Sequence, residues 1–512
     1  MRAQLITVAL GLLLNAFACA DSLKLDKQGL LLLDSQGREL DRVTVRAKRW
    51  DQRELPDGLL AVVLDTDRGR PLLVRARAQR LQVSVLEVPD FEVDALCLYR
   101  DPQGLMQLFL LGAEGLSEQW LLGEGSARPL RHLATAPSPH GCQVDDVRGT
   151  LQFAEAGVGM WSVNAEPEGR VQRRLLKPGA PPPASARRQA WPLLQPSAQT
   201  DVVARQGDAA DDPAIWVDPQ DGQRSLVLGT NKKQGLLVYG LDGHQRQLLE
   251  VGRINNVDLR QGIVSGGARW DLAVATQRDE QSLVLFQIEP GGQVRELARL
   301  PTDLNDIYGL CVARTADGQL DAFPNDKDGR VQHYRIALNE GRWQARLLRQ
   351  FKLASQPEGC VVDERENRLF VGEEKRGIWA FDARAERTMQ PELVMPVGPQ
   401  LVADVEGLAV YQGRGGAPSY LLVSAQGDDS YLVLDAKPPY ALRGGFRIGI
   451  NAVLGIDGSS ETDGIEVTSA DLGGPYAEGL LVVQDGHKRL PDGPQNFKYL
   501  PWAEVARALQ LR

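Results

Sequence analysis

The chain has 512 residues, 43% hydrophobic and 24% charged, which suggests two to four domains of a soluble globular protein. Its net charge of −9 argues against nucleic acid as the main partner, because phosphate backbones attract clustered Lys and Arg. The charge still leaves room for a phosphorylated small molecule, since bound metal ions can reverse the local sign of an acidic site. With 52 glycines, 30 prolines and few aromatic residues, the composition favours many short strands joined by turns.

Residues 1–20 have the pattern of an export signal. Arg2 provides a charged start, Ile6–Leu14 form a short apolar run, and Ala18-Cys19-Ala20 is a cleavage site of the A-x-A type. The run is too short for a good membrane span and no other stretch resembles one, so we expect no membrane span. The sequence predicts export to the periplasm or out of the cell. A lipoprotein attached through Cys19 is the alternative that these residues leave open.

Proline residues cluster between positions 178 and 196 without strand periodicity, which indicates a linker. We therefore expect a signal peptide at 1–20, a first domain at 21–185, a linker at 186–205 and a second domain at 206–512. Short apolar runs such as 225–230 and 236–239 are joined by polar turns, which is a hairpin pattern. These pairs recur about every fifty residues, the spacing of propeller blades. Only residues 501–511 have a clear helical pattern.

The two domains resemble each other in sequence. Cys97 and Cys142 have counterparts 214 and 218 positions further along, at Cys311 and Cys360, and the flanking residues match in order. We interpret this as an internal duplication, with a shorter first copy that holds three or four blades. The simplest pairing is Cys97–Cys142 and Cys311–Cys360, between inner strands of neighbouring blades. Small buried thiols packed side by side are the alternative.

Acidic and amide side chains recur at strand ends throughout the second domain. Each alone is a common turn residue, but a propeller brings the same end of every blade to one face. Converging carboxylates repel one another unless cations neutralise them, and clusters of oxygen ligands alone suit Ca²⁺. Among these residues are Asp211, Asp212, Glu358, Glu374, Asp404, Glu406, Gln426, Asp457 and Asp463, which the family resemblance given below implies to be the ligands of several calcium ions.

Basic residues alternate with these acids along the chain. Arg offers a two-pronged donor to phosphate and Lys a point charge, so their combination with a calcium cluster is typical of a polyanion site. The residues that we predict to bind substrate are Lys232, Lys233, Arg260, Arg278, Tyr308 and Lys327.

From about Asp208 to its end, the chain resembles the β-propeller phytases. The matching segments, in order, are 211–216, 230–235, 255–260, 308–309, 358–359, 373–374, 404–408, 424–430, 457–465, 480–486 and 496–502. The resemblance implies an all-β fold, a six-bladed β-propeller preceded by the smaller, incomplete propeller-like domain. It also implies a calcium-dependent 3-phytase that acts on phytate (myo-inositol hexakisphosphate) and on lower inositol phosphates. The chain departs from the family at Thr276-Gln277-Arg278 and at Pro324, which affects loop details.

By this resemblance, the catalytic residues are Lys232, Arg278, Tyr308, Lys327 and Glu358. No G-x-S-x-G motif is present, which favours direct attack by a metal-activated water. We expect a monomer. The alternatives are a calcium-stabilised propeller that binds anions without catalysis, and another propeller hydrolase such as a lactonase.

The first domain lacks most of the predicted site. Tyr308, Lys327, Glu358 and Glu374 align with Asp94, Ala113, His140 and Ala156, whereas Glu373 keeps its counterpart, Glu155. We predict a domain that is inactive alone and that protects an edge of the second domain or helps to hold substrate.

Overall fold

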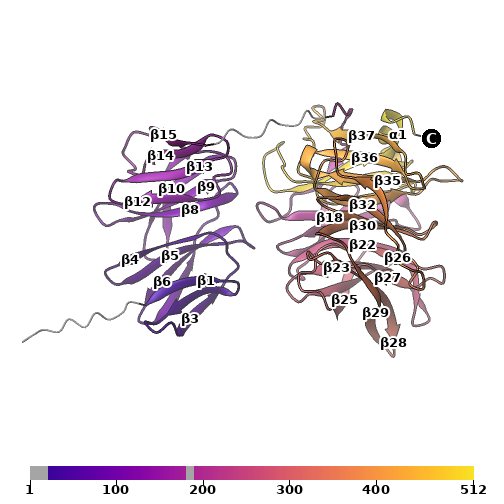
Figure 1. The fold of residues 1–512 in the computed structure, drawn as a ribbon, viewed down its shortest axis with the longest axis horizontal. Coiled ribbons are helices and arrows are strands. Elements are labelled where there is room, and N and C mark those ends of the chain that lie inside the picture. The colour runs from indigo at the N-terminus through magenta and orange to yellow at the C-terminus, as the bar shows by residue number, and fades with distance from the viewer. Residues whose placement is uncertain (1–20, 180–188, 512) are drawn as a thin grey trace, which may run out of the picture. The chain divides into compact units, whose positions relative to one another are not determined.

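The computed structural model describes residues 21–179 and 189–511, which form two compact units that divide after residue 184 (Figure 1). The predicted signal peptide, residues 1–20, lies outside the described residues, as does part of the predicted linker. Both units consist almost wholly of antiparallel sheets. Among the described residues, no helix has the length and apolar character needed to cross a membrane.

The second unit contains six sheets, which we call blades one to six. Blade one contains β18 (Ala210–Trp216), β19 (Leu226–Asn231), β20 (Gly235–Gly240) and β21 (Gln245–Leu249); blade two contains β22 (Ile254–Ser265), β23 (Ala268–Gln277), β24 (Ser282–Ile288) and β25 (Val294–Pro301). Blade three contains β26 (Val312–Arg314), β27 (Leu320–Ala322), β28 (Arg330–Asn339) and β29 (Arg342–Lys352); blade four contains β30 (Pro357–Asp363), β31 (Arg368–Glu373), β32 (Gly377–Asp382) and β33 (Glu392–Pro396). Blade five contains β34 (Val405–Tyr411), β35 (Tyr420–Ala425), β36 (Ser430–Asp435) and β37 (Leu442–Ile448); blade six contains β38 (Ile465–Thr468), β39 (Leu480–Asp485) and β40 (Asn496–Pro501). Three short 3-10 helices cover Gly222–Arg224, Gln426–Asp428 and Gly474–Tyr476, and the predicted C-terminal helix is α1 (Trp502–Ala508).

The six blades close into a ring. The first strand of each blade contacts the first strand of the next, and β38 contacts β18. Six apolar cores fill the spaces between neighbouring blades, including the space between blades six and one. Closure by both strand contacts and apolar packing confirms the predicted six-bladed propeller.

Two short strands from the predicted linker complete the ring. β16 (Leu193–Leu194) pairs with β37, and β17 (Ala198–Gln199) pairs with β40 to give blade six its fourth strand. These residues are therefore part of the second unit rather than a free connection. Strand pairing of this kind ties the two ends of the propeller sequence together.

A fully buried lysine reinforces this junction. The Lys498 ammonium lies 2.7 Å from Asp457 Oδ1 and 2.9 Å from Asp485 Oδ2. It also donates to Gln199 Oε1 and Asn496 Oδ1, each at 2.9 Å. Gln199 belongs to β17 and the other partners to blade six or the loop before it, so one internal cation links the linker strand to the last blade.

The first unit contains four sheets in an incomplete arc. Its strands are β1 (Ser22–Asp26), β2 (Gly29–Leu33), β3 (Glu39–Thr44); β4 (Trp50–Leu55), β5 (Gly58–Asp65), β6 (Arg70–Arg77), β7 (Arg80–Val85); β8 (Val93–Arg100), β9 (Met106–Gly112), β10 (Leu116–Leu122), β11 (Ala127–Ala134); and β12 (Cys142–Asp145), β13 (Thr150–Glu155), β14 (Gly159–Asn164), β15 (Arg174–Pro178). Three apolar cores lie between successive sheets. Within the described ranges, no fourth core of this kind joins the last sheet to the first.

The last two sheets of the first unit repeat blades three and four. Trp161 donates to Glu155 at 2.5 Å, and Trp379 donates to Glu373 at 2.8 Å. Both disulfides that we predicted from the duplication are present, Cys97–Cys142 and Cys311–Cys360, with separations of 45 and 49 residues. Each joins the first strand of a sheet, or the residue just before it, to the first strand of the next sheet, which confirms that the two copies share one framework.

Replacing both Cys311 and Cys360 with Ser should destabilise the second unit. Opening a loop of this length removes about 4 kcal/mol in the chain-entropy model. Denaturant unfolding of the double variant checks this, and Cys97→Ser/Cys142→Ser is the matched control, since its effect should fall on the first unit. An unchanged unfolding midpoint for the second unit would contradict the role of this disulfide.

Lys498→Met should destabilise the second unit by about 3–5 kcal/mol, because it leaves buried carboxylates without their cation. Urea unfolding measures the loss. Lys437→Met is the control: Lys437 pairs with Glu366 at the exposed surface, so its removal should change stability little. Equal midpoints for the two variants would refute the role of the Lys498 cage.

Candidate functional site

Strand register brings the predicted residues together. In each blade the second strand runs antiparallel to the first, so the end of the second strand lies beside the start of the first. Ala210 pairs with Asn231, Pro357 with Glu373, and Val405 with Ala425. Carboxylates that begin a first strand therefore meet side chains from the turn after a second strand.

Three glutamates form the centre of the site. Glu358 begins β30, Glu406 begins β34, and Glu374 follows β31. All three are buried, and one carboxylate oxygen from each lies within 4.8 Å of the others. Asn255 Nδ2 donates to Glu358 Oε1 at 2.9 Å, and the Gln356 amide donates to Glu374.

Several carboxylate oxygens of this site have no hydrogen-bond donor. Glu406 Oε2 and both oxygens of Asp211 are buried without one. Burial, followed by the charge of Glu358, raises the pKa of Glu406 well above its usual value, and the same two causes raise the pKa of Glu374 to about 7. Buried, unsatisfied carboxylates are costly unless a cation or a proton neutralises them. The donor set fits calcium, which binds six to eight oxygens.

Lys232 is the internal cation on the other side of the site. Its ammonium lies 2.9 Å from Asp463, 2.5 Å from Asp208 and 3.7 Å from Asp211. Burial alone would lower the pKa of Lys232, but these carboxylates raise it well above its usual value, so the lysine stays charged. Gln426 donates to the second oxygen of Asp463 at 2.7 Å, which orients that carboxylate.

The ring of Tyr308 contacts two further cations. Lys327 Nζ is 3.9 Å from the centre of its ring, and the Arg278 guanidinium carbon is 5.4 Å away. Arg278 also donates to Asn255 Oδ1 at 3.3 Å. Burial and the charge of Glu358 raise the pKa of Tyr308 far above its usual value, so the phenol keeps its proton. Arg278, Asn255 and Glu358 thus form one hydrogen-bonded chain.

Asn255, Asp208 and Gln356 belong to the site although the sequence did not single them out. Asn255 lies in a segment that matches the family, and it begins β22 at the place where other blades carry an acid. Its position at the start of a first strand was the available signal. Asp208 and Gln356 stand just before β18 and β30, where only the register reveals their partners.

Four of the predicted residues lie outside the central glutamate cluster. Asp212 lies under the site and accepts from the Val257 amide at 3.1 Å. Asp404 pairs with Lys375 at the rim. Lys233 donates to the Gln206 carbonyl at 2.6 Å. The Asp457 carboxylate is occupied by Lys498, so the structure does not bring it to the glutamate cluster.

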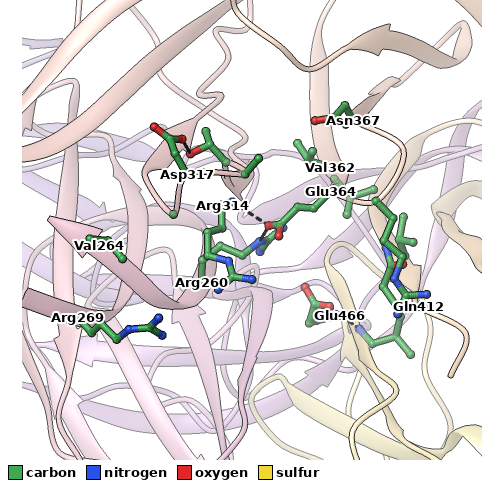
Figure 2. A pocket seen from close by; sticks show the side chains of 18 residues that line it. Arg260, Val264, Arg269, Arg314, Asp317, Val362, Glu364, Asn367, Gln412 and Glu466 are labelled. Atoms are coloured by element: carbon green, nitrogen blue, oxygen red, sulfur yellow. Dashed lines mark hydrogen bonds and ion pairs between the residues drawn. The ribbon is translucent and has the colours of Figure 1, made fainter. Parts of the chain in front are cut away.

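Arg260 is at the end of the propeller's central channel that lies opposite the glutamate cluster. It stands five residues after Asn255 in β22, a rise of about 16 Å along a strand. Its guanidinium pairs with Asp258 at 2.7 Å and Glu364 at 2.5 Å and lines a separate pocket (Figure 2). The structure thus separates Arg260 from the other predicted substrate residues, because strand length rather than sequence spacing sets the end at which a side chain lies.

In the first unit, other residues occupy the positions equivalent to this site. Asp94 and His140, the counterparts of Tyr308 and Glu358, contact each other: the His140 amide donates to Asp94 Oδ2 at 3.0 Å. Glu155 keeps its hydrogen bond to Trp161, as Glu373 does to Trp379. Glu155 and Glu373 are therefore structural acids, and the corresponding place in the first unit has no glutamate cluster among the described residues.

Comparison with known proteins places this arrangement in a family. The family model described as Phytase matches residues 181–511, a span that begins before β16 and β17. A 3-phytase of Bacillus subtilis (strain 168) is 35% identical over 324 residues, which cover 61% of this chain and 84% of the relative. Among solved structures, the β-propeller domain of Myceliophteria thermophila Cps50 (Swd1) covers 70% of this chain and 95% of its own, with 13% identity and a TM-score of 0.34. On the family match and the Bacillus relative, the chain belongs to the phytase family.

Proposed function

We propose that this protein releases phosphate from myo-inositol hexakisphosphate with calcium ions held at the glutamate face, the end of the propeller where Glu358, Glu374 and Glu406 lie. The observation that carries the proposal is the cluster of Glu358, Glu374 and Glu406, whose carboxylates meet within 4.8 Å beside Lys232, Arg278 and Lys327. Buried oxygens without donors and fixed cations beside them suit a ligand that brings both metal ions and phosphate groups.

The residues divide the work by their chemistry. Glu358, Glu374, Glu406, Asp211, Asp404 and Gln426 are the proposed calcium ligands, with Asp463 shared between metal and Lys232. When bound, calcium supplies positive charge and lowers the pKa of a water molecule. Lys232, Arg278 and Lys327 neutralise the phosphoryl oxygens as negative charge develops on them. Tyr308, still protonated, donates a hydrogen bond to the same group.

Asn255 positions two of these groups. By accepting from Arg278 and donating to Glu358, it fixes a phosphate-binding side chain relative to a metal ligand. Supporting contacts of this kind set the orientation that the reaction needs. We also propose that the protein is exported through residues 1–20, because the two disulfides of the chain suit an oxidising compartment.

Glu358→Gln should lower calcium-dependent phosphate release from inositol hexakisphosphate at least about 100-fold, since even outer partners of a metal site cost 10–100-fold. Chelation of calcium in the unmodified protein should abolish release. Glu504→Gln, at an exposed position of α1, is the matched control and should keep full activity. Release that survives chelation, or a fully active Glu358→Gln protein, would refute the proposed calcium site.

Tyr308→Phe should lower kcat about 10–100-fold through loss of one hydrogen bond to a charged group. Because the phenol stays protonated, the shape of the pH–rate profile between about pH 7 and 10 should be the same in both proteins. Tyr411→Phe, whose hydroxyl donates to the Glu478 carbonyl elsewhere, is the control. A descending alkaline limb that vanishes in Tyr308→Phe would show that the tyrosine titrates, contrary to this role.

A further inference from the structure

The second unit has a large cavity, whose lining residues Figure 2 shows, at the end of the first strands away from the glutamate cluster. Its volume is about 760 Å³, enough for a small organic ligand. The ends of first strands line it: β22 contributes Arg260, the turn after β26 contributes Thr315, and the turn after β30 contributes Glu364. None of the proposed calcium ligands lines this cavity.

Arginine dominates the charge of the cavity. Arg260 is neutralised by Asp258 and Glu364. The other three lining arginines, Arg269, Arg314 and Arg365, form no ion pair within the part of the chain that the structure describes. Arg365 donates to the Gly413 carbonyl at 2.7 Å, a contact that leaves its charge uncompensated.

The acids around the cavity do not pair with Arg269 or Arg314. Asp317 accepts hydrogen bonds from the neutral side chains of Thr315 and Gln319. Burial, followed by the charge of Asp258, raises the pKa of Glu466 to about 8. Four arginines thus stand beside Asp258, Glu364, Asp317 and Glu466, and within the described residues the arginines without an acid partner are Arg269, Arg314 and Arg365.

Two of these arginines lie close together. A Cβ atom added to Gly262 would be 3.6 Å from the Nη1 atoms of both Arg269 and Arg314, so these atoms are at most twice that distance apart. Neither side chain makes a hydrogen bond or ion pair within the described residues. Both side chains are exposed to solvent, and an oxyanion placed between them would accept hydrogen bonds from both guanidinium groups.

We infer that this cavity is a second anion site, built to bind a phosphate group between Arg269 and Arg314. The charge and geometry alone carry the anion site, and the choice of phosphate rests on the proposed function, which releases it. The group comes either from free phosphate, the product, or from an inositol phosphate. In both cases the site lies away from the reacting centre. It therefore binds product or substrate without blocking catalysis.

Calorimetric titration of calcium-free protein tests the site with two probes, inorganic phosphate and inositol hexakisphosphate. Arg269→Gln/Arg314→Gln should weaken binding of at least one probe tenfold or more, and the probe affected identifies the source. Arg507→Gln, an exposed arginine of α1, is the matched control and should bind as the unmodified protein does. Arg269→Lys/Arg314→Lys should recover part of the affinity, because it restores charge without the two-pronged donor.

Unchanged affinity for both probes in the Gln double variant would overturn the inference. So would loss of all binding in Lys232→Met, which would place every anion at the glutamate face. A thermal melt confirms that the double variant is folded, and phosphate release with calcium should be retained, because neither arginine lies at the reacting centre. Failure of the proposed function appears separately, as absence of release from unmodified protein that still binds phosphate at this cavity.

Discussion

The antiparallel register of the first two strands in each blade is the constraint on which the site depends. It places the end of one strand beside the start of another, six times around a closed ring. Residues as far apart in sequence as Lys232 and Asp463 thereby come within 2.9 Å. The packed apolar cores between blades hold these strand ends in place.

The second unit neutralises buried carboxylates in two different ways. Between the linker strand and blade six, the Lys498 ammonium has four oxygen partners, and the cluster is internally satisfied. At the glutamate face, Lys232 satisfies only part of the negative charge, and oxygens of Asp211 and Glu406 keep no donor. The first arrangement links the linker strand to blade six, whereas the second leaves carboxylate oxygens without a donor.

The first unit separates framework from chemistry within one chain. It retains the disulfide and the Trp–Glu hydrogen bond of the duplicated segment, which depend only on strand packing. It lacks the glutamates and the tyrosine, and Asp94 and His140 contact each other instead. The framework is thus independent of the part of the site that blades three and four carry.

The sequence by itself determined the all-β class, the duplication, the cysteine pairing and most of the charged residues at one face, because these follow from local pattern and from residue type. Only the tertiary structure decided how each charge is used. Because of its place along β22, Arg260 lies at the far end of the channel and pairs with Asp258. The packing of blade six places Asp457 beside Lys498, with which it forms an ion pair. Asn255 connects Arg278 to Glu358 through contacts between residues 23 and 103 positions apart. The contact with Arg278 follows from the hairpin of β22 and β23, whereas the contact with Glu358 of blade four is set by ring closure, which no local sequence pattern encodes.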